Sequence, residues 1–385
     1  MKRILQISNY LYPHIGGIEQ VARDIAAALG ERDDFEQKIV CFNENASGGG
    51  YNCKREETVH DYVDGVEVIR CGCVLKASSQ SISLSFGKKI KAVMDSFKPD
   101  IVILHFPNPF QAFFLKRCLK QDTKFVLYWH SDIIKQKFLR KLFHVQTMDL
   151  LKRADKIVAT SPYYVEGSAY LSRFREKCVV IPNCINTSRM AVSDDISDRA
   201  EKIREENAGK IICFALGRHI PYKGFSYLVE ASKYLDERFA IYIGGKGELT
   251  ESLKREAGDD KKISFLGRVS DEDLIAYYMA MDIFCFPSVT KNEAFGIALA
   301  EGMYFGKPAI TFTIPGSGVN YVNLNDVSGI ECPNADSRAY AEAMTRLADD
   351  IALRERLGKG AKDRVERNFT QEQFNKNIKT LLSEL

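Results

Sequence analysis

The sequence has few of the features that mark secreted, disulfide-bonded or membrane-spanning proteins. Its ten cysteines in 385 residues are too sparse for a disulfide scaffold, and no two of them have CxxC spacing. It has no run of about eighteen apolar residues, and the apolar stretch after the basic start is too short for a signal peptide. Internal repeats and low-complexity tracts are also missing. We therefore expect reduced thiols, a cytoplasmic location and no transmembrane segment.

The length and composition fit two globular domains of about 150–200 residues each. Hydrophobic residues make up 45% of the chain and charged residues 27%. The net charge of +3 is unevenly distributed, because residues 1–190 hold 28 Lys and Arg against 20 Asp and Glu, and the remainder holds 26 against 31. A basic half indicates an anionic partner such as a nucleic acid, a phosphorylated ligand or a membrane surface.

Short apolar segments alternate with amphipathic ones along both halves of the chain. Ile101–His105 and Lys124–His130 are typical strand candidates in the first half, as Ile211–Leu216 and Ile283–Pro287 are in the second. This alternation predicts an α/β protein with two doubly wound parallel sheets. A polar segment without a strand signal places the boundary near residue 190. We therefore predict domains over 1–190 and 191–365, and a further helix over 366–385.

Three motifs follow predicted strands, where doubly wound folds bind their ligands. The first contains Gly16 and Gly17, and paired glycines allow a backbone to approach a ligand closely. It lacks GxGxxG spacing, which disfavours a nicotinamide cofactor, and a simple tight turn is the alternative. The second contains Arg218 and Lys223, which suit two adjacent phosphates unless they are merely solvated loop residues.

The third motif places Glu293 eight positions before Glu301. Carboxylates accept hydrogen bonds from sugar hydroxyls, and the amides of Phe295, Gly296 and Ile297 between them can bind phosphate. Because the helix around Glu301 is apolar on nearly every side, we expect this carboxylate to be buried and to need a partner.

Together these motifs resemble the retaining glycosyltransferase family four. The resemblance rests on Glu-x7-Glu followed by Gly306-Lys307-Pro308, on Gly-Arg-x4-Lys-Gly, and on Gly-Gly-x-Glu near the start. It implies the GT-B architecture, in which two Rossmann-like domains flank an interdomain cleft and a C-terminal helix crosses back to the first domain. The first domain would bind the acceptor and the second the nucleotide sugar. It also implies transfer from a nucleotide-diphosphate sugar with no metal and no other cofactor.

The resemblance implies a role for each matching residue. Glu301 would bind the ribose hydroxyls, Glu293 the donor sugar, and Arg218 with Lys223 the diphosphate. His130 would face the transferred sugar. The other donor-binding positions that the resemblance implies are Gly16, Gly17, Gly245, Arg268, Val269, Phe295, Gly296 and Ile297.

Several alternatives stay open. Asp271-Glu272-Asp273 has the spelling of a metal motif, but Ser270 before it predicts a helix N-cap. Basic and apolar residues alternate over 133–143, which is typical of a helix lying on anionic lipid or of a core-packed helix with a solvated basic face. A nucleotide-sugar epimerase and a nucleic-acid-binding protein are the alternative functions, although no nucleic-acid-binding motif is present. We expect a GDP- or UDP-linked hexose donor, with the sequence around Glu293 and Ser317 closer to mannosyltransferases. The expected acceptor is a saccharide or a lipid-linked saccharide, as in surface polysaccharide or glycolipid synthesis.

Overall fold

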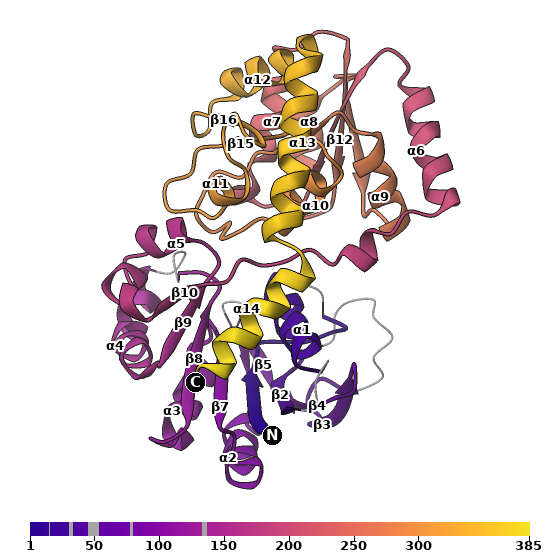
Figure 1. Cartoon of the computed structure of the whole chain (residues 1–385). Coiled ribbons are helices and arrows are strands. Elements are labelled where there is room, and N and C mark those ends of the chain that lie inside the picture. Colours follow the sequence, from indigo (N-terminus) through magenta and orange to yellow (C-terminus); the bar gives the residue numbers. More distant parts are fainter. Residues whose placement is uncertain (15, 31–33, 45–53, 78–79, 133–136) are drawn as a thin grey trace. The chain divides into compact units, whose positions relative to one another are not determined.

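The computed structural model describes the chain except for residues 15, 31–33, 45–53, 78–79 and 133–136 (Figure 1). The chain divides into two compact units. The first contains Met1–Thr160, Ser168–Ile181 and Phe374–Leu385, and the second contains Ser161–Gly167 and Pro182–Gln373. The second unit therefore begins before residue 190, and Met190 is buried there in a cluster with Ile196 and Ile275. The end of the chain belongs to the first unit.

The first unit is built on an eight-stranded sheet in the order β10-β9-β8-β7-β1-β2-β4-β3. Its strands are β1 (Lys2–Ile7), β2 (Phe35–Asn43), β3 (Val59–Val63), β4 (Val66–Gly72), β7 (Ile101–Phe106), β8 (Lys124–Trp129), β9 (Lys156–Ala159) and β10 (Cys178–Val180). All neighbours pair in parallel except β3 with β4, and β5 (Leu75–Ala77) and β6 (Gln80–Ile82) form a separate hairpin. Every residue of β7 is buried, as expected for an inner parallel strand covered on both faces.

The first unit also contains helices. They are α1 (Gly17–Gly30), α2 (Phe86–Phe97), α3 (Pro109–Cys118), α4 (Lys137–Arg153) and α14 (Gln371–Ser383), with one-turn helices at Leu171–Arg173 and Arg175–Lys177. The start of α3 shows how the sequence sets a boundary, because Asn108 accepts a hydrogen bond from the amide of Gln111 and Pro109 occupies the first helical position.

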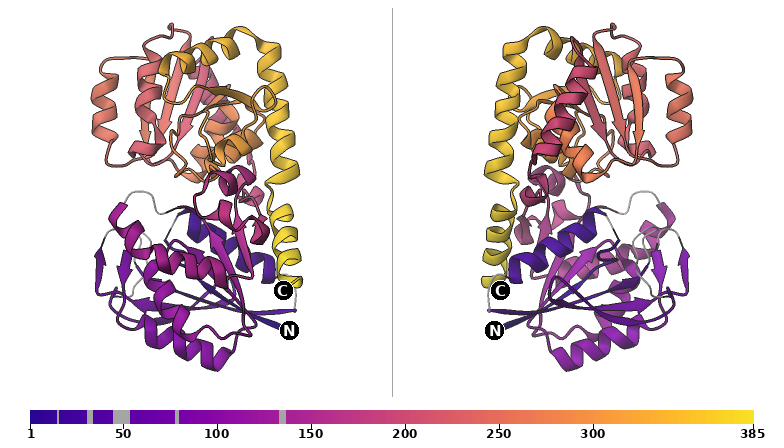
Figure 2. Two further views of the ribbon diagram at one scale, coloured as in Figure 1. Left: turned by 90° about the vertical axis from the view of Figure 1, so that its left-hand side faces the viewer. Right: turned by 90° about the vertical axis from the view of Figure 1, so that its right-hand side faces the viewer.

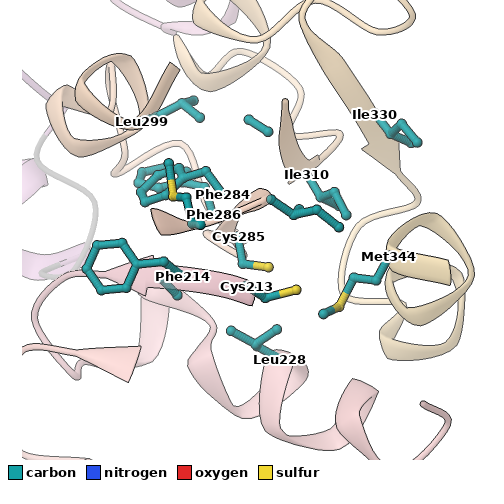
Figure 3. Packing of buried hydrophobic residues seen from close by; sticks show 14 of the residues in the cluster. Cys213, Phe214, Leu228, Phe284, Cys285, Phe286, Leu299, Ile310, Ile330 and Met344 are labelled. Atoms are coloured by element: carbon teal, nitrogen blue, oxygen red, sulfur yellow. The ribbon is translucent and has the colours of Figure 1, made fainter. Parts of the chain in front are cut away.

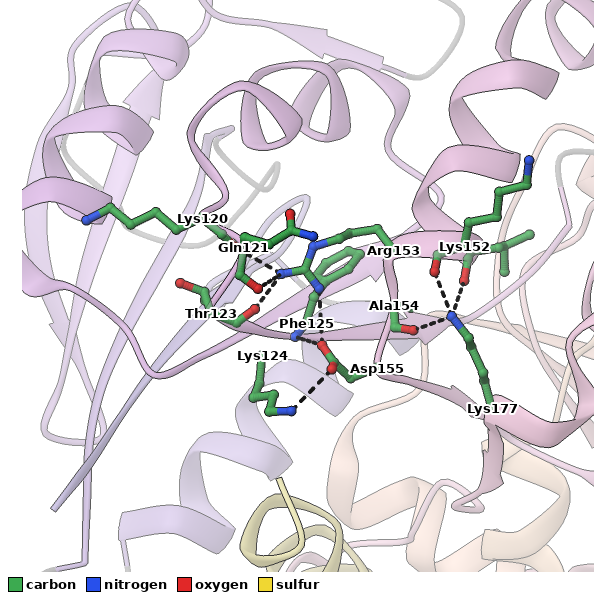
Figure 4. Close-up of polar contacts among 11 residues, drawn as sticks. Lys120, Gln121, Thr123, Lys124, Phe125, Lys152, Arg153, Ala154, Asp155 and Lys177 are labelled. Atoms are coloured by element: carbon green, nitrogen blue, oxygen red, sulfur yellow. Dashed lines mark hydrogen bonds and ion pairs between the residues drawn. The ribbon is translucent and has the colours of Figure 1, made fainter.

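Two basic residues of the first unit are held by the protein's own carbonyl groups (Figure 4). Arg153 donates to the carbonyl of Thr123 at 2.6 Å, and Lys177 donates to the carbonyls of Lys152 and Ala154 at 2.6 and 2.8 Å. The last carbonyl groups of α4 have no hydrogen-bond donors within the helix, so Lys177 donates the hydrogen bonds that they need. Part of the basic excess of this half is therefore structural and is not available to an anionic partner.

The second unit is built on a fully parallel six-stranded sheet in the order β13-β12-β11-β14-β15-β16. The strands are β11 (Ile211–Leu216), β12 (Phe239–Gly244), β13 (Ile263–Gly267), β14 (Ile283–Phe286), β15 (Ala309–Phe312) and β16 (Gly329–Cys332). In chain order within the unit this arrangement is 3-2-1-4-5-6, the Rossmann order. Its direction reverses between β11 and β14, and open α/β sheets bind ligands at such a reversal.

The second unit also contains helices, several of which pack on the two faces of this sheet (Figure 2). They are α5 (Pro162–Gly167), α6 (Asp194–Glu206), α7 (Phe225–Ser232), α8 (Thr250–Ala257), α9 (Asp271–Ala280), α10 (Ile297–Tyr304), α11 (Val319–Val322), α12 (Ser337–Asp349) and α13 (Ile351–Asn368), with one-turn helices at Thr187–Met190 and Pro221–Lys223. In the core of this unit, Cys213, Cys285 and Met344 converge in Figure 3. Phe286 and Leu299 flank the loop between β14 and α10, and their burial anchors that loop to the sheet.

Candidate active site

The loops that follow β11 and β14 meet at the strand-order reversal of the second sheet. Lys223 Nζ lies 2.5 Å from Glu293 Oε2, and the two side chains are only 13% and 12% exposed. Ser288 Oγ donates a second hydrogen bond to the same carboxylate oxygen at 3.2 Å. The structure thus brings together a predicted phosphate ligand and a predicted sugar ligand that lie far apart in the sequence.

Backbone packing fixes these two loops against each other. Gly224 has φ +66°, and a Cβ atom at this position would lie 2.0 Å from the carbonyl oxygen of Pro287. The amide of Val289 donates to the carbonyl of Tyr222 at 3.0 Å. Only glycine permits this approach, so Lys223 is held beside Glu293 by the chain itself.

Arg218 lies on the same loop after β11 as Lys223. Its side chain is exposed, and within the described part of the chain it has no recorded ion pair. Gly245, after β12, packs against the same loop, because a Cβ on Gly245 would lie 1.9 Å from the carbonyl oxygen of Gly217. The glycine at 245 therefore allows the Arg218 loop to lie directly on the neighbouring strand end.

Helix α10 begins shortly after Glu293 in the sequence. Gly296 has φ +93° and precedes the helix, and the structure records no acceptor among the described residues for the amides of Gly296, Ile297 and Ala298. The side chain of Phe295 is 2% exposed and packs edge-on against Phe369. Phe295 therefore anchors the loop through its ring, and only its backbone faces the site. A helix N-terminus with free amides favours an anion.

Glu301 is buried in α10, as the apolar helix pattern predicts, with 8% of the residue exposed. Its partner is the hydroxyl of Tyr278 on α9, which donates to Oε2 at 3.1 Å. Burial raises the pKa of the Glu301 carboxyl, while the nearby charge of Arg189 opposes this rise. Arg189 itself binds both carboxylate oxygens of Asp271, at 3.1 and 2.5 Å. The carboxylate of Glu301 therefore keeps acceptor capacity for a ligand.

The remaining predicted residues of the second unit follow β13. Arg268 is exposed, and Val269 is half-buried against the end of β12, within 3.0 Å of the position that a Cβ on Gly244 would take. Sequence reasoning missed Tyr278 and Arg189. Tyr278 is an ordinary residue of an apolar helix in sequence, and its hydroxyl meets Glu301 only through the fold.

Three predicted residues lie in the first unit. Gly17 is the first residue of α1, and a Cβ on Gly16 would lie 2.3 Å from Oε2 of the buried Glu19. His130 follows β8 and is 8% exposed, and its Nε2 lies 2.9 Å from Nδ1 of His105. Sequence reasoning missed His105, although it lies near the end of β7, as His130 lies just after the end of β8.

The Asp271-Glu272-Asp273 segment is a helix cap, as predicted. Ser270 caps α9 by accepting from the amide of Asp273. Asp271 is bound by Arg189 and Asp273 by Arg199, the latter at 2.7 Å. In the part of the chain that the structure describes, no three His, Cys, Asp or Glu side chains group as metal ligands would.

The predicted basic amphipathic segment over 133–143 lies largely outside the described residues. Residues 133–136 are not described, and neither are the side chains of 137–142. Of the helices that the structure does describe, none combines the length and the apolar character needed to cross a bilayer.

Comparison with known protein families matches both halves of the chain. Residues 15–189 match the model described as Glycosyltransferase Family 4, and residues 197–364 match that described as Glycosyl transferases group 1. The chain is 31% identical to the O-antigen chain mannosyltransferase C of Escherichia coli, with 96% of this chain and 94% of that protein covered. It is 33% identical to the D-rhamnosyltransferase WbpZ of Pseudomonas aeruginosa, with 94% and 90% covered.

Solved structures agree in fold. The sucrose-phosphate synthase from Thermosynechococcus elongatus matches with a TM-score of 0.80 at 19% identity, over 100% of this chain and 99% of that one. Anabaena HepE in complex with UDP matches with a TM-score of 0.75 at 17% identity, over the full length of both chains.

Proposed function

The chain belongs to glycosyltransferase family 4 and has the GT-B fold of two Rossmann-like domains, and from this premise we propose a specific reaction. We propose that the enzyme transfers a hexose, mannose before others, from a nucleotide-diphosphate donor to a saccharide or lipid-linked saccharide, with retention of the anomeric configuration. The observation that carries this proposal is the Lys223–Glu293 ion pair at the strand-order reversal, next to the free amides of α10.

Lys223 and the α10 amides supply what a departing diphosphate needs. The structure pairs Lys223 with Glu293 at 2.5 Å. A bound diphosphate competes for the ammonium group and leaves Glu293 free to accept hydrogen bonds from sugar hydroxyls. Arg218 is exposed and has no ion pair to give up among the described residues, so it adds a second cation at little cost. Such preorganised charge is usually the largest catalytic contribution.

Glu301 is the proposed ligand of the ribose. It is buried, it keeps acceptor capacity beyond the bond from Tyr278, and it lies two helical turns or less from the α10 amides. Two vicinal hydroxyls are good donors to one carboxylate, whereas an anion is repelled there. This division supports a donor bound with its diphosphate at the start of α10 and its nucleoside further along the helix.

Retention needs no protein nucleophile in this scheme. The bond between the anomeric carbon and the diphosphate oxygen breaks, and the acceptor oxygen forms its bond on the same face of the sugar. The acceptor proton passes to the departing diphosphate oxygen, so the atoms and charges balance. Because Lys223, Arg218 and the α10 amides stabilise the leaving group, we propose that the reaction requires no metal.

The donor and the acceptor are proposed from relatives. The Escherichia coli relative is named as an O-antigen mannosyltransferase and the Pseudomonas relative as a D-rhamnosyltransferase, which supports a mannose-type donor. The structural neighbour HepE is titled as a complex with UDP. We therefore propose a GDP- or UDP-linked hexose donor, and surface polysaccharide or glycolipid as the product.

A thermal-shift screen against GDP, UDP, ADP and their sugar conjugates, with and without EDTA, tests donor binding. A ligand that binds only the folded protein raises the melting temperature, and the rise grows with affinity. We expect stabilisation by one nucleotide family that EDTA does not change. No shift with any nucleotide would contradict the proposal, and a shift abolished by EDTA would contradict metal-free binding.

Transfer is tested with the stabilising donor and a panel of saccharide and polyprenyl-diphosphate-saccharide acceptors. Proton NMR of the product reads the anomeric configuration directly. An α product from an α-linked donor supports retention, and a β product refutes it. Conversion of the donor to an epimeric nucleotide sugar without any acceptor would instead identify an epimerase.

A further inference from the structure

A line of three buried polar side chains crosses the sheet of the first unit and ends at His130. It starts at Gln6 on β1, passes through His105 on β7 and reaches His130 just after β8, and these three strands are neighbours. Gln6 Oε1 lies 3.1 Å from His105 Nε2, and His105 Nδ1 lies 2.9 Å from His130 Nε2. Gln6 and His105 are both 0% exposed. The arrangement is therefore enclosed by protein along most of its length.

The orientation of Gln6 sets the direction of hydrogen bonding along this line. Gln6 Nε2 donates to the carbonyl of Ala22 in α1 at 3.3 Å, so Oε1 is the atom that faces His105. An amide oxygen can only accept, and Nε2 of His105 must therefore carry the proton. If the side-chain amide of Gln6 were flipped, its oxygen would face the carbonyl oxygen of Ala22, and the two acceptors would repel each other. A flipped His105 ring would lose both of its hydrogen bonds.

The same logic passes to the second ring. A neutral His105 protonated on Nε2 has a bare Nδ1, which can only accept, so Nε2 of His130 must donate to it. The Nδ1 atom of a neutral His130 is then bare as well. Burial lowers the pKa of His105 to about 3 and that of His130 well below its usual range, which favours the neutral form of both rings.

Nδ1 of His130 is the open end of this line. No hydrogen-bond partner for it is recorded within the described residues, whereas both ring nitrogens of His105 are occupied. His130 also retains its 8% exposure, while His105 has none. The open atom lies beyond the carboxyl end of a parallel strand, where ligands of this fold class bind.

We propose that Gln6 and His105 are positioning residues that hold His130 in its Nε2-protonated form, so that His130 Nδ1 accepts a hydrogen bond from a hydroxyl group of the bound sugar. The proposal rests on the proposed function for the nature of the ligand, but the tautomer is a property of the protein alone. The proposal makes His130 Nδ1 a hydrogen-bond acceptor. Such an atom selects a ligand group that can donate, and it disfavours a carbonyl, an ether oxygen or a phosphate.

The tautomer can be measured without any substrate. The chain has six histidines, so ¹⁵N-histidine labelling gives a spectrum simple enough for assignment by single His105→Phe and His130→Phe variants. Two-bond nitrogen–proton correlations distinguish a protonated from a bare ring nitrogen. We expect both His105 and His130 to be protonated on Nε2 and to remain neutral from pH 8 to pH 5. A proton on Nδ1 of His130 would overturn the proposal.

The sharpest variant is Gln6→Glu. A carboxylate of the same size beside His105 Nε2 favours the imidazolium form of His105, which then donates from Nδ1 as well. His130 must accept on Nε2 and carry its own proton on Nδ1, so the polarity of the open end is inverted. The spectrum of the variant should show His105 doubly protonated and His130 protonated on Nδ1. An unchanged His130 tautomer in this variant would refute the coupling.

Gln37→Glu is the matched control. Gln37 lies on the neighbouring strand β2 and donates from Nε2 to the carbonyl of Ala26 in the same helix, at 2.8 Å. Its Oε1 has no hydrogen-bond partner among the residues that the structure describes. It therefore makes the same kind of contact with α1 without facing a histidine. We expect this control to leave both tautomers unchanged. A tautomer shift in Gln37→Glu would show that the effect is non-specific and would overturn the assignment to Gln6.

Donor analogues then connect the tautomer to catalysis. Replacing one sugar hydroxyl by fluorine keeps an acceptor and removes the donor. At the hydroxyl that faces His130, we expect fluorine to lower kcat/KM of the wild type by about 10-fold or more, since a lost hydrogen bond costs about 1.5 kcal/mol. Gln6→Glu should weaken that preference, because a hydroxyl and a fluorine can both accept from a protonated Nδ1, and Gln6→Met should weaken it as well. Equal discrimination in all three proteins would refute the role of the line. If no nucleotide sugar is a substrate, the proposed function fails while the spectra still decide the tautomer.

Discussion

Replacing Glu301 by glutamine should stabilise the folded protein and weaken its binding of the nucleotide. Glu301 is 8% exposed, and burial raises the pKa of its carboxyl. A carboxyl with a raised pKa in the folded state stabilises the protein most below its unfolded pKa and least above its folded pKa. The ionised carboxyl of the wild type therefore carries the cost of burying a charge. Glutamine removes this charge and keeps a carbonyl oxygen for the hydroxyl of Tyr278, which now donates to Glu301 at 3.1 Å.

The same change should weaken nucleotide binding. Hydrogen bonds to a charged group contribute about 1.5–3 kcal/mol, and the glutamine amide can accept from fewer ribose hydroxyls. We expect the Kd of the nucleoside diphosphate to rise about 10- to 100-fold in titration calorimetry. Thermal unfolding of the free protein should shift upward, by about 2–4 °C for each kcal/mol gained in a domain of this size.

Glu331→Gln is the control for this experiment. Burial also raises the pKa of Glu331, which lies on β16 and is not among the proposed ligands. It should raise the melting temperature without changing the nucleotide Kd. An unchanged Kd in Glu301→Gln would refute the ribose assignment, and a lowered melting temperature would refute the electrostatic argument.

Three further outcomes test the remaining structure. Arg218→Ala should lower kcat about 10²–10³-fold and shift unfolding in urea by no more than about 0.5 kcal/mol, because the side chain is exposed; a wild-type rate would remove Arg218 from the site. Gly224→Ala should lower the free energy of unfolding by about 2–5 kcal/mol, since its Cβ would meet the carbonyl of Pro287. Gly209→Ala, also at positive φ but in open space, should lower it by only about 1 kcal/mol, and equal losses would contradict the packing argument. The lowered pKa of His105, about 3, means that acidification protonates this residue in the unfolded chain first, so His105 alone should remove about 2 kcal/mol of stability between pH 7 and pH 5. His105→Phe should make the total loss over this range smaller by about that amount, and an unchanged loss would contradict the argument.

Strand and helix order could be predicted where apolar patterns are strong. Ile211–Leu216 and the helix beginning at Asp271 match the structure within a residue, because a buried strand and a capped amphipathic helix are both encoded locally. The edge strand β3 (Val59–Val63) was not predicted. It alternates half-buried and exposed residues, and its antiparallel pairing depends on β4.

The site was only partly predictable, for a similar reason. Lys223 and Glu293 stand in recognisable motifs, and their spacing in sequence does not reveal that they form an ion pair. Tyr278 meets Glu301 from another helix, and Arg189 reaches Asp271 across 82 residues of sequence. His105 was within reach of sequence reasoning, because two neighbouring strand candidates both end near a histidine.

The division of the chain also has a consequence for synthesis. The first unit contains Met1–Thr160 and Phe374–Leu385, so its two ends leave the ribosome before and after nearly all of the second unit. Lys2 Nζ donates to the carbonyl of Leu382 at 3.1 Å, and Phe374 and Ile378 are 2% and 1% exposed. A nascent or prematurely terminated chain leaves uncovered the surface that α14 packs on. The first unit, although translated first, is thus completed only after the second, and a truncated product should display an apolar surface that proteases and chaperones recognise.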